Sequence, residues 1–391
     1  METRPANPLR RLRDWARSLD FTLARRFGLA NREDRLFFLL IGAVGIVGGL
    51  LGGATDLLID LLRIVLWGSR GDLLTVIPKV HRWVIVTAPA IGGVLVGILY
   101  WRTHRRAQGE GGGGEGMGML IEAVALSGGK IAPRPVMINA LAAIVTVGAG
   151  GSLGREGPMI RLGAMISSWM GQRLEIPPHR LKILVGCGAA AGLAATYNIP
   201  IGGTLFAMEV ILGNFALEIF GPIVASSVIA TLIARAITGN QPLYAAPEYT
   251  LRTYWEMLPY AGLGIAAAFA SVLFMIGVSL GGKVFSKLRF LPRPFHPVVG
   301  MTLLGVIGLY VPHALGRGYG TINLALAGTL KLPPHVAPSQ ELTGLLLLGI
   351  AAVKLIATAL TRGCGGAGGM FTPSIAYGAL IGGAYGSFMH A

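Results

Sequence analysis

The sequence predicts an all-α integral membrane protein, and composition is the first reason. Of its 391 residues, 53% are hydrophobic and 13% are charged, and the mean hydropathy is +0.64. Soluble domains carry about 25% charged residues, so this chain lacks the polar side chains that a soluble surface needs. Glycine, at 59 residues, has about twice its usual share of ~7%, which suits helices whose backbones pack closely.

Long apolar stretches are the second reason. Residues 36–67 and 81–101 are long enough to cross a bilayer, which takes about 20 apolar residues. Many later stretches are shorter and are interrupted by glycine and proline, a pattern typical of transporters whose broken helices meet at a shared site inside the membrane. These later stretches are residues 136–153, 159–171, 181–195, 200–213, 219–238, 257–281, 297–312, 341–360 and 371–389.

Basic residues crowd the segment before the first span. Nine of the arginines lie in residues 1–35, and the whole chain has a net charge of +15. We prefer a cytoplasmic anchor to nucleic-acid binding, because positive charge beside a first span holds that end in the cytoplasm. Residues 8–28 also have the pattern of an amphipathic helix on an anionic leaflet. No signal peptide is evident. From the apolar stretches and this charge we expect a multi-pass protein of the inner (plasma) membrane, with its N-terminus in the cytoplasm and its membrane domain at residues 36–391.

An internal repeat divides this membrane domain. The glycine-rich runs Gly114–Gly118 and Gly316–Gly320 each open an apolar helix, and Gly154–Pro158 and Gly369–Pro373 follow them downstream. The members of the two pairs are 202 and 215 residues apart, so their order is kept with little drift. Matched broken helices in two halves indicate a transporter repeat. The expected repeats are residues 36–213 and 219–391.

The run Gly154–Pro158 has the chemistry of an anion site. Proline fits the first turn of a helix, where its missing N–H would be unpaired, and glycine leaves neighbouring N–H groups uncovered. A helix N-terminus has free donors and a partial positive charge, which together attract anions. Gly369–Pro373 supplies a second such terminus. Two converging termini would bind an anion firmly enough to admit it and weakly enough to release it.

Glu156 is an acidic residue in an apolar region, and acids inside a membrane usually have a function. At a helix N-terminus its carboxylate would be held by the same donors that attract the anion. It could take the place of the anion when it is ionised, and leave when it is protonated or displaced. A simple helix cap is the alternative. Because a second helix start of the same kind occurs in the other half of the chain, we favour a gate over a simple cap.

These motifs resemble those of the CLC family of chloride channels and proton-coupled chloride exchangers, in particular the bacterial type without a cytoplasmic regulatory domain. Gly154–Pro158 matches the GREGP motif of the family in full, and Gly369–Pro373 matches its GxFxP motif. The similarity runs from about residue 36 to the end of the chain. Three further stretches are CLC-like, namely Gly202–Glu209, Gly316–Gly328 and Lys354–Pro373.

The resemblance implies a bundle of broken, tilted helices with an inverted internal repeat, and a homodimer in the lipid bilayer. It implies that Glu156 is the gate, and that the backbone N–H groups of Arg155, Glu156 and Gly157 bind an outer anion. Those of Met370 and Phe371 would bind a central anion. Chloride or another small anion would be transported, with protons in the exchangers, and no cofactor or metal is expected.

Val210 is the first departure from the family pattern. In the family's exchangers, a glutamate that delivers protons from inside directly follows the position of Glu209, whereas this chain has Val210, as the channels do. Valine cannot carry a proton. We therefore expect a voltage-gated-type chloride channel gated by Glu156, with a proton-coupled exchanger as the alternative. Fluoride export by a CLC relative is a weaker interpretation, because that branch of the family alters the last residue of GREGP, whereas this chain retains Pro158.

Glu115 is the second departure. The loop Gly114–Gly118 resembles the family's GSGIP loop, but Glu115, between Gly114 and Gly116, replaces the serine that helps to hold the central anion. A carboxylate about 4 Å from an anion would cost about 4 kcal/mol at an effective dielectric constant of ~20. Glu115 must therefore point away, be protonated, or serve another purpose such as a proton station. The anion preference stays open.

The third departure is the end of the chain, which stops at Ala391 within an apolar stretch. Members of the family continue with further helices, which supply part of the dimer interface and a tyrosine at the central site. We therefore expect a C-terminal truncation, with a short form as the alternative. An intramembrane enzyme is disfavoured, because the chain has neither an H-E-x-x-H zinc motif nor a G-x-S-x-G elbow.

Overall fold

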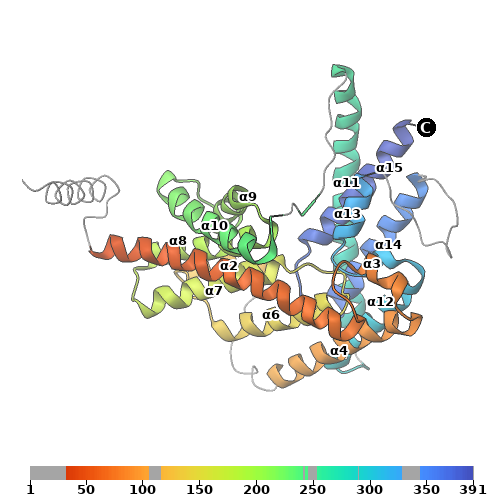
Figure 1. Ribbon diagram of the computed structural model, residues 1–391, viewed down its shortest axis with the longest axis horizontal. Helices are drawn as coiled ribbons and strands as arrows, with labels where there is room; N and C mark the ends of the chain where they lie inside the picture. Colours follow the sequence, from red (N-terminus) through yellow and green to blue (C-terminus); the bar gives the residue numbers. More distant parts are fainter. Residues whose placement is uncertain are drawn as a thin grey trace, which may run out of the picture.

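The structure is a computed structural model, and it describes residues 32–104, 116–240, 243–244, 253–288, 290–327 and 344–390. In these ranges the chain forms α-helices α2 to α15, with short 3₁₀ turns, one π-helical turn and no strand (Figure 1). The prediction of an all-α bundle is confirmed. The expected amphipathic helix at residues 8–28 lies outside the described residues.

Five helices are long and apolar enough to cross a membrane. They are α2 (Arg32–Trp67), α4 (Arg82–His104), α10 (Leu217–Thr238), α11 (Met257–Lys287) and α14 (Gly344–Gly363). The other helices are shorter or less apolar, as the glycine and proline interruptions predict. They are α3 (Leu73–Val76), α5 (Met117–Leu126), α6 (Pro133–Gly148), α7 (Glu156–Arg173), α8 (Pro178–Tyr197), α9 (Pro200–Phe206), α12 (His296–Tyr310), α13 (Tyr319–Leu326) and α15 (Phe371–His390).

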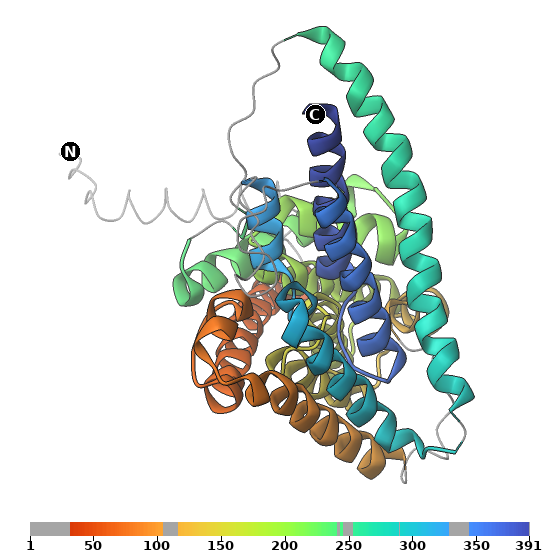
Figure 2. The same cartoon turned by 90° about the vertical axis from the view of Figure 1, so that its right-hand side faces the viewer.

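The helices pack in two groups that meet around the starts of α7 and α15. In the first group α7 packs along α8, and α10 packs against α2 and α8. In the second group α14 packs against both α11 and α15. Figure 1 shows the two groups on opposite sides of the molecule, and Figure 2 shows α11 running along the edge of the second group.

Small residues let α7 and α8 approach closely. A Cβ on Gly163 of α7 would lie 2.0 Å from the carbonyl oxygen of Gly188 in α8. A Cβ on Gly188 would in turn lie 2.2 Å from the carbonyl oxygen of Gly163. Any larger residue at either position would force the helices apart. This contact is of the kind that small residues make between membrane helices, and it fixes the direction of α7.

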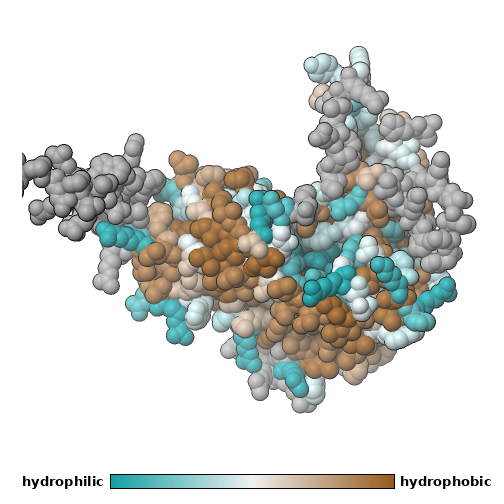
Figure 3. Space-filling view, in the orientation of Figure 1, coloured by the Kyte–Doolittle hydropathy of each residue, from teal (hydrophilic) through white to brown (hydrophobic). Residues whose placement is uncertain are grey.

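The outer surface is rich in apolar side chains. On α11, Ile265 is 64% exposed and Phe269 is 75% exposed. Figure 3 shows wide hydrophobic areas on the face in view. Such a surface needs an apolar environment rather than water, which agrees with the lengths of the five spanning helices. The protein is a membrane protein.

The internal repeat is visible as matched helices. Helices α5, α6 and α7 of the first half correspond in order to α13, α14 and α15 of the second half. Gly154 and Gly369, the first residues of the matched runs, form an antiparallel pair. The N–H of Gly154 donates to the carbonyl of Gly369 (2.7 Å), and the N–H of Gly369 donates back to Gly154 (2.6 Å). A reciprocal contact between equivalent residues is what a two-fold axis produces, in agreement with an inverted repeat.

Candidate functional site

The candidate site lies where α7 and α15 begin, directly beside the Gly154–Gly369 pair. The bond from Met159 N to Arg155 O (3.1 Å) closes the first turn of α7, and the bond from Ser374 N to Met370 O (3.0 Å) closes that of α15. The N–H groups ahead of these bonds have no partner within the helix. The paired loops therefore bring two partly positive helix ends to one place.

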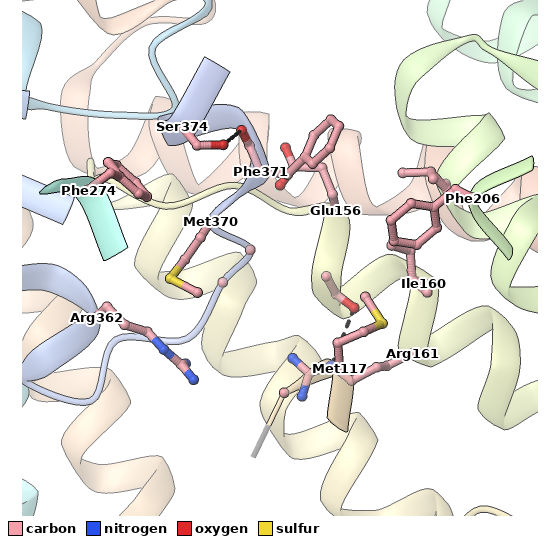
Figure 4. A pocket seen from close by; sticks show the side chains of 15 residues that line it. Met117, Glu156, Ile160, Arg161, Phe206, Phe274, Arg362, Met370, Phe371 and Ser374 are labelled. Atoms are coloured by element: carbon pink, nitrogen blue, oxygen red, sulfur yellow. Dashed lines mark hydrogen bonds between the residues drawn. The ribbon is translucent and has the colours of Figure 1, made fainter. Parts of the chain in front are cut away.

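The carboxyl group of Glu156 lies at this junction (Figure 4). The residue is 1% exposed. Its Oε1 atom accepts a short hydrogen bond from the hydroxyl of Thr372. The hydroxyl of Tyr197, at the end of α8, lies 2.8 Å from Thr372 Oγ1. Because the Thr372 hydrogen is directed to Glu156, Tyr197 donates to Thr372, and two hydroxyls in series hold the carboxyl group.

Glycine is required beside this carboxyl group. A Cβ on Gly369 would lie 2.7 Å from Oε2 of Glu156 and 2.9 Å from the N atom of Gly157. A Cβ on Gly154 would lie 1.9 Å from the same Oε2. Both glycines of the antiparallel pair thus give the carboxyl group its space. Oε2 itself is buried and has no hydrogen-bond partner among the described residues.

The side chain of Arg155 is tied to neighbouring elements. Its guanidinium makes a short ion pair with Asp56 of α2 and donates to the carbonyl of Thr196 in α8 (3.1 Å). The Nη1 atom of Arg317 lies 3.8 Å from Oδ1 of the same carboxylate. Two buried guanidinium groups therefore share Asp56, and this pairing orients Arg155 independently of any bound anion. An acid such as Asp56 within a long apolar helix is itself a sequence signal of function.

A cavity of about 370 Å³ adjoins the carboxyl group. Met370 and Phe371 line it and are 42% and 47% exposed, so the start of α15 faces open space. Gly116 and Met117 bring the start of α5 to the same cavity. Three broken helices therefore converge here, and of the four glycine-rich runs only Gly316–Gly320 contributes no residue to the lining.

Two of the expected loop residues, Gly114 and Glu115, lie outside the described residues, so the orientation of Glu115 stays a prediction. Val210 lies on the π-helical turn Ala207–Leu212 and is 37% exposed. Turns of this kind are frequent at functional sites. Glu209, which precedes it, is also exposed. Neither residue is part of the cavity lining.

Sequence reasoning missed several residues of the site. Thr372 occupies the variable position of the GxFxP motif, so the motif itself carries no signal for it. Tyr197 lies at the end of an alanine-rich helix, where an aromatic residue suggests only packing. Arg161 and Arg362 also line the cavity. The positive charge of these two arginines within apolar helices is a sequence signal of a functional position.

Comparison with known proteins assigns the family. A family described as "Voltage gated chloride channel" matches residues 92–391. A chloride channel protein of Ralstonia nicotianae, described as ClcB-like, is 31% identical over 364 residues, which is 90% of this chain and 79% of the relative. The voltage-gated ClC-type chloride channel ClcB of Citrobacter koseri is 29% identical over 350 residues, covering 89% of this chain and 80% of that protein.

Solved structures share the fold. A slow cyanobacterial Cl⁻/H⁺ antiporter matches with a TM-score of 0.71 and 19% identity, over 90% of this chain and 80% of its own. A CLC-type fluoride/proton antiporter matches with a TM-score of 0.67 and 22% identity, over 88% and 80%. With the GREGP match and the paired helix ends, these similarities show that the chain belongs to the CLC family of voltage-gated chloride channels and related transporters.

Proposed function

We propose that the protein moves chloride or another small anion across the membrane through the place that the Glu156 carboxyl group now occupies. The observation that carries this proposal is the position of that group between the starts of α7 and α15, where Thr372 of α15 donates to its Oε1 and Gly154 and Gly369 leave room for its Oε2. Donors that hold a carboxylate also suit a small anion. The carboxylate and the anion therefore compete for one place.

Protonation decides the outcome of this competition. An ionised Glu156 is attracted by the partly positive helix ends and accepts the Thr372 hydroxyl hydrogen. A protonated Glu156 loses most of this attraction, so an anion takes its place at the N–H groups of Arg155, Glu156 and Gly157. The N–H groups of Met370 and Phe371, at the cavity, then form the next station. Glu156 is thus the gate. The anion path opens when Glu156 binds a proton or when an anion displaces its carboxylate.

Proton-coupled exchange is the form of transport with the better support. Glu156 carries a proton each time it leaves the site in its neutral form, so anion movement and proton movement share one residue. Two of the proteins with a similar fold are described as a Cl⁻/H⁺ antiporter and a fluoride/proton antiporter. The prediction of a channel from Val210 alone is therefore placed second.

A passive channel is the second candidate, and one observation favours it. Val210 stands where family exchangers carry the glutamate that delivers protons from inside, and no side-chain proton carrier replaces it at that position. The curated relative of Citrobacter koseri is described as a channel. A channel would use Glu156 only to close the path.

The reversal potential separates the two candidates. The purified protein is reconstituted in liposomes with opposed pH and chloride gradients, and the voltage at zero current is measured. For exchange we expect this potential to shift with the pH gradient at constant chloride. A potential that follows chloride alone would contradict exchange and leave the channel. A potential insensitive to chloride would contradict anion transport altogether.

We also propose a topology and an assembly for the protein. Residues 1–35 form a cytoplasmic segment because of their positive charge, and residues 36–391 form the membrane domain of a homodimer in the inner membrane. Protease protection of an N-terminal tag in sealed vesicles tests the orientation. Cross-linking in native membranes tests the dimer.

A further inference from the structure

Two buried threonines occupy equivalent places in the two halves of the membrane domain. Thr146 lies in the last turn of α6, and Thr361 lies in the last turn of α14. They are 215 positions apart, the same separation as Gly154 and Gly369, and both are fully buried. The proposed function gives neither threonine a role.

The hydroxyl groups of the two threonines are directed in the same way. Thr146 Oγ1 donates its hydrogen to the carbonyl of Ala142 (2.8 Å), and Thr361 Oγ1 donates to that of Ala357 (2.7 Å), one turn earlier in each helix. A hydroxyl that has given its only hydrogen can still accept through its lone pairs. Each Oγ1 atom is therefore an acceptor that is fixed at the end of its helix.

The donor to each hydroxyl comes from the opposite half of the chain. The N–H of Ala367, in the loop that leads to α15, donates to Thr146 Oγ1 of α6 (3.3 Å). The N–H of Ser152, in the loop that leads to α7, donates to Thr361 Oγ1 of α14 (3.3 Å). Ser152 and Ala367 are again 215 positions apart. The two bonds are thus related by the two-fold axis of the repeat, and they cross between the halves.

Each threonine also holds the loop of its own half, through its main chain. Gly151 N–H donates to the carbonyl of Thr146 (2.8 Å), and Gly366 N–H donates to the carbonyl of Thr361 (2.9 Å). The carbonyl of each threonine therefore binds its own loop, and the hydroxyl binds the opposite loop. The reciprocal bonds of the glycine pair follow two residues downstream of the crossed bonds. Both loops are thus held from both halves just before the helices begin.

We propose that Thr146 and Thr361 are positioning residues, and that each fixes the helix start of the opposite half. The N–H groups at the starts of α7 and α15 then keep one geometry while the Glu156 side chain moves. A buried N–H without an acceptor is costly, so loss of either hydroxyl would displace the loop that it holds. Binding groups need positions fixed to within about 0.5 Å. The inference rests on the proposed function for its effect on anions, whereas the crossed positioning stands without it.

Hydrogen exchange of the full chain in lipid nanodiscs, measured by mass spectrometry, tests the crossing. For Thr361→Val we expect amide exchange in the loop with Ser152 to become about fivefold to hundredfold faster, because one buried N–H loses its acceptor. For Thr146→Val we expect the same acceleration in the loop with Ala367. T146S and T361S keep the hydroxyl and should exchange as the wild type does. T361A removes the hydroxyl in a smaller side chain and is a second test of the same bond.

Exchange that becomes faster only in the loop of the mutated half, or in neither loop, would overturn the inference.

Chloride binding tests whether this positioning matters for the anion. In isothermal titration calorimetry with sodium chloride, T146V and T361V should each lose about threefold to tenfold in affinity, which is the net contribution of one hydrogen bond expressed as affinity. The serine variants should keep the wild-type affinity. Unchanged chloride affinity in both valine variants would overturn the positioning role.

Thr231 of α10 provides the matched control, because it is also buried and its hydroxyl donates within its own helix, to the carbonyl of Ser227 (2.8 Å). T231V makes the same substitution away from both loops, and it should leave chloride affinity unchanged even where it lowers thermal stability. A loss of affinity in T231V as large as that in T361V would overturn the positioning role, because lower stability alone would then weaken binding.

The two measurements also separate this inference from the proposed function. Crossed acceleration of exchange, in a protein whose reversal potential ignores chloride, would leave the positioning of the helix starts standing and remove the transport proposal. Chloride-dependent reversal potentials without crossed acceleration would remove the inference alone.

Discussion

The starts of α7 and α15 are built alike and carry different side chains. Both runs begin with a glycine, Gly154 or Gly369, and both place a proline four residues later. The two glycines bond to each other reciprocally. Between glycine and proline, however, α7 has Arg-Glu-Gly and α15 has Met-Phe-Thr. The backbones of the two runs are therefore related by the two-fold axis of the repeat, whereas their side chains are not.

This difference separates two tasks. Backbone N–H groups at two symmetric helix ends make a place for an anion, and that task needs no particular side chain. Closing the place needs a removable negative charge, which only α7 supplies, through Glu156. Holding that charge needs a donor, which α15 supplies through Thr372 at the position equivalent to Gly157. Each half thus provides what the other lacks.

The largest effect should come from Glu156→Gln, which removes the titratable difference between the two helix starts. We expect chloride flux to be retained or increased and its pH dependence to disappear. Proton flux should fall at least about tenfold, since an amide cannot exchange a proton with the path. Chloride efflux from proteoliposomes between pH 4.5 and 8, with parallel pH-electrode recording, measures both.

Gly157 and the rest of the α7 start are unchanged in this variant, so chloride binding should persist and serves as its internal control. An unaltered pH profile in Glu156→Gln would contradict the central assignment of the gate. A loss of all flux with normal chloride binding would mean that transport requires the Glu156 carboxyl group, rather than being blocked by it.

Thr372→Val should have the next largest effect, because it removes the donor to the carboxylate. A hydrogen bond to a charged group contributes about 1.5–3 kcal/mol, and about 1.36 kcal/mol corresponds to one pH unit. The ionised, closed form loses this stabilisation, so a lower proton concentration suffices to open the path. The pH of half-maximal chloride flux should therefore rise by about one to two units. Thr372→Ser keeps the hydroxyl and should stay near the wild type.

A midpoint in Thr372→Val that stays at the wild-type pH would show that the helix ends alone hold Glu156. In that case the difference between the two helix starts would be limited to Glu156 itself.

Much of this arrangement could be predicted from the sequence, because it depends on local signals. Glycine and proline at fixed spacing mark helix starts, and their recurrence at Gly154–Pro158 and Gly369–Pro373 predicted two converging ends. An isolated acid in an apolar segment marked Glu156. The structure brings these features together as expected.

The rest depends on contacts between distant segments, which a single sequence does not reveal. Tyr197 reaches Thr372 across 175 positions of the chain, and Asp56 reaches Arg155 from another helix. Neither pair has a characteristic spacing. The inverted relation of the halves also needed the reciprocal Gly154–Gly369 bonds, since sequence order is the same for parallel and inverted repeats.

Tyr197→Phe should have a smaller effect than Thr372→Val, because its hydroxyl acts on the carboxylate only through Thr372. A hydrogen bond between neutral groups contributes about 0.5–1.5 kcal/mol. The pH of half-maximal chloride flux should rise by less than about one unit. Tyr260→Phe, on an exposed part of α11, is the matched control and should cause no shift. A shift as large as that of Thr372→Val would mean that Tyr197 acts on Glu156 directly.

Arg155→Met should have the smallest effect on the anion, and it makes the α7 start match α15, where Met370 stands at this position. Since the backbone N–H groups remain, chloride affinity by calorimetry should change less than about threefold. Thermal stability should fall by a few degrees, because Asp56 loses one partner. Breaking a buried pair costs about 3–5 kcal/mol, but Asp56 is 22% exposed and keeps Arg317 at 3.8 Å, so a smaller loss is expected. A tenfold fall in chloride affinity would show that the guanidinium itself acts on the anion, and that the two helix starts differ in binding as well as in gating.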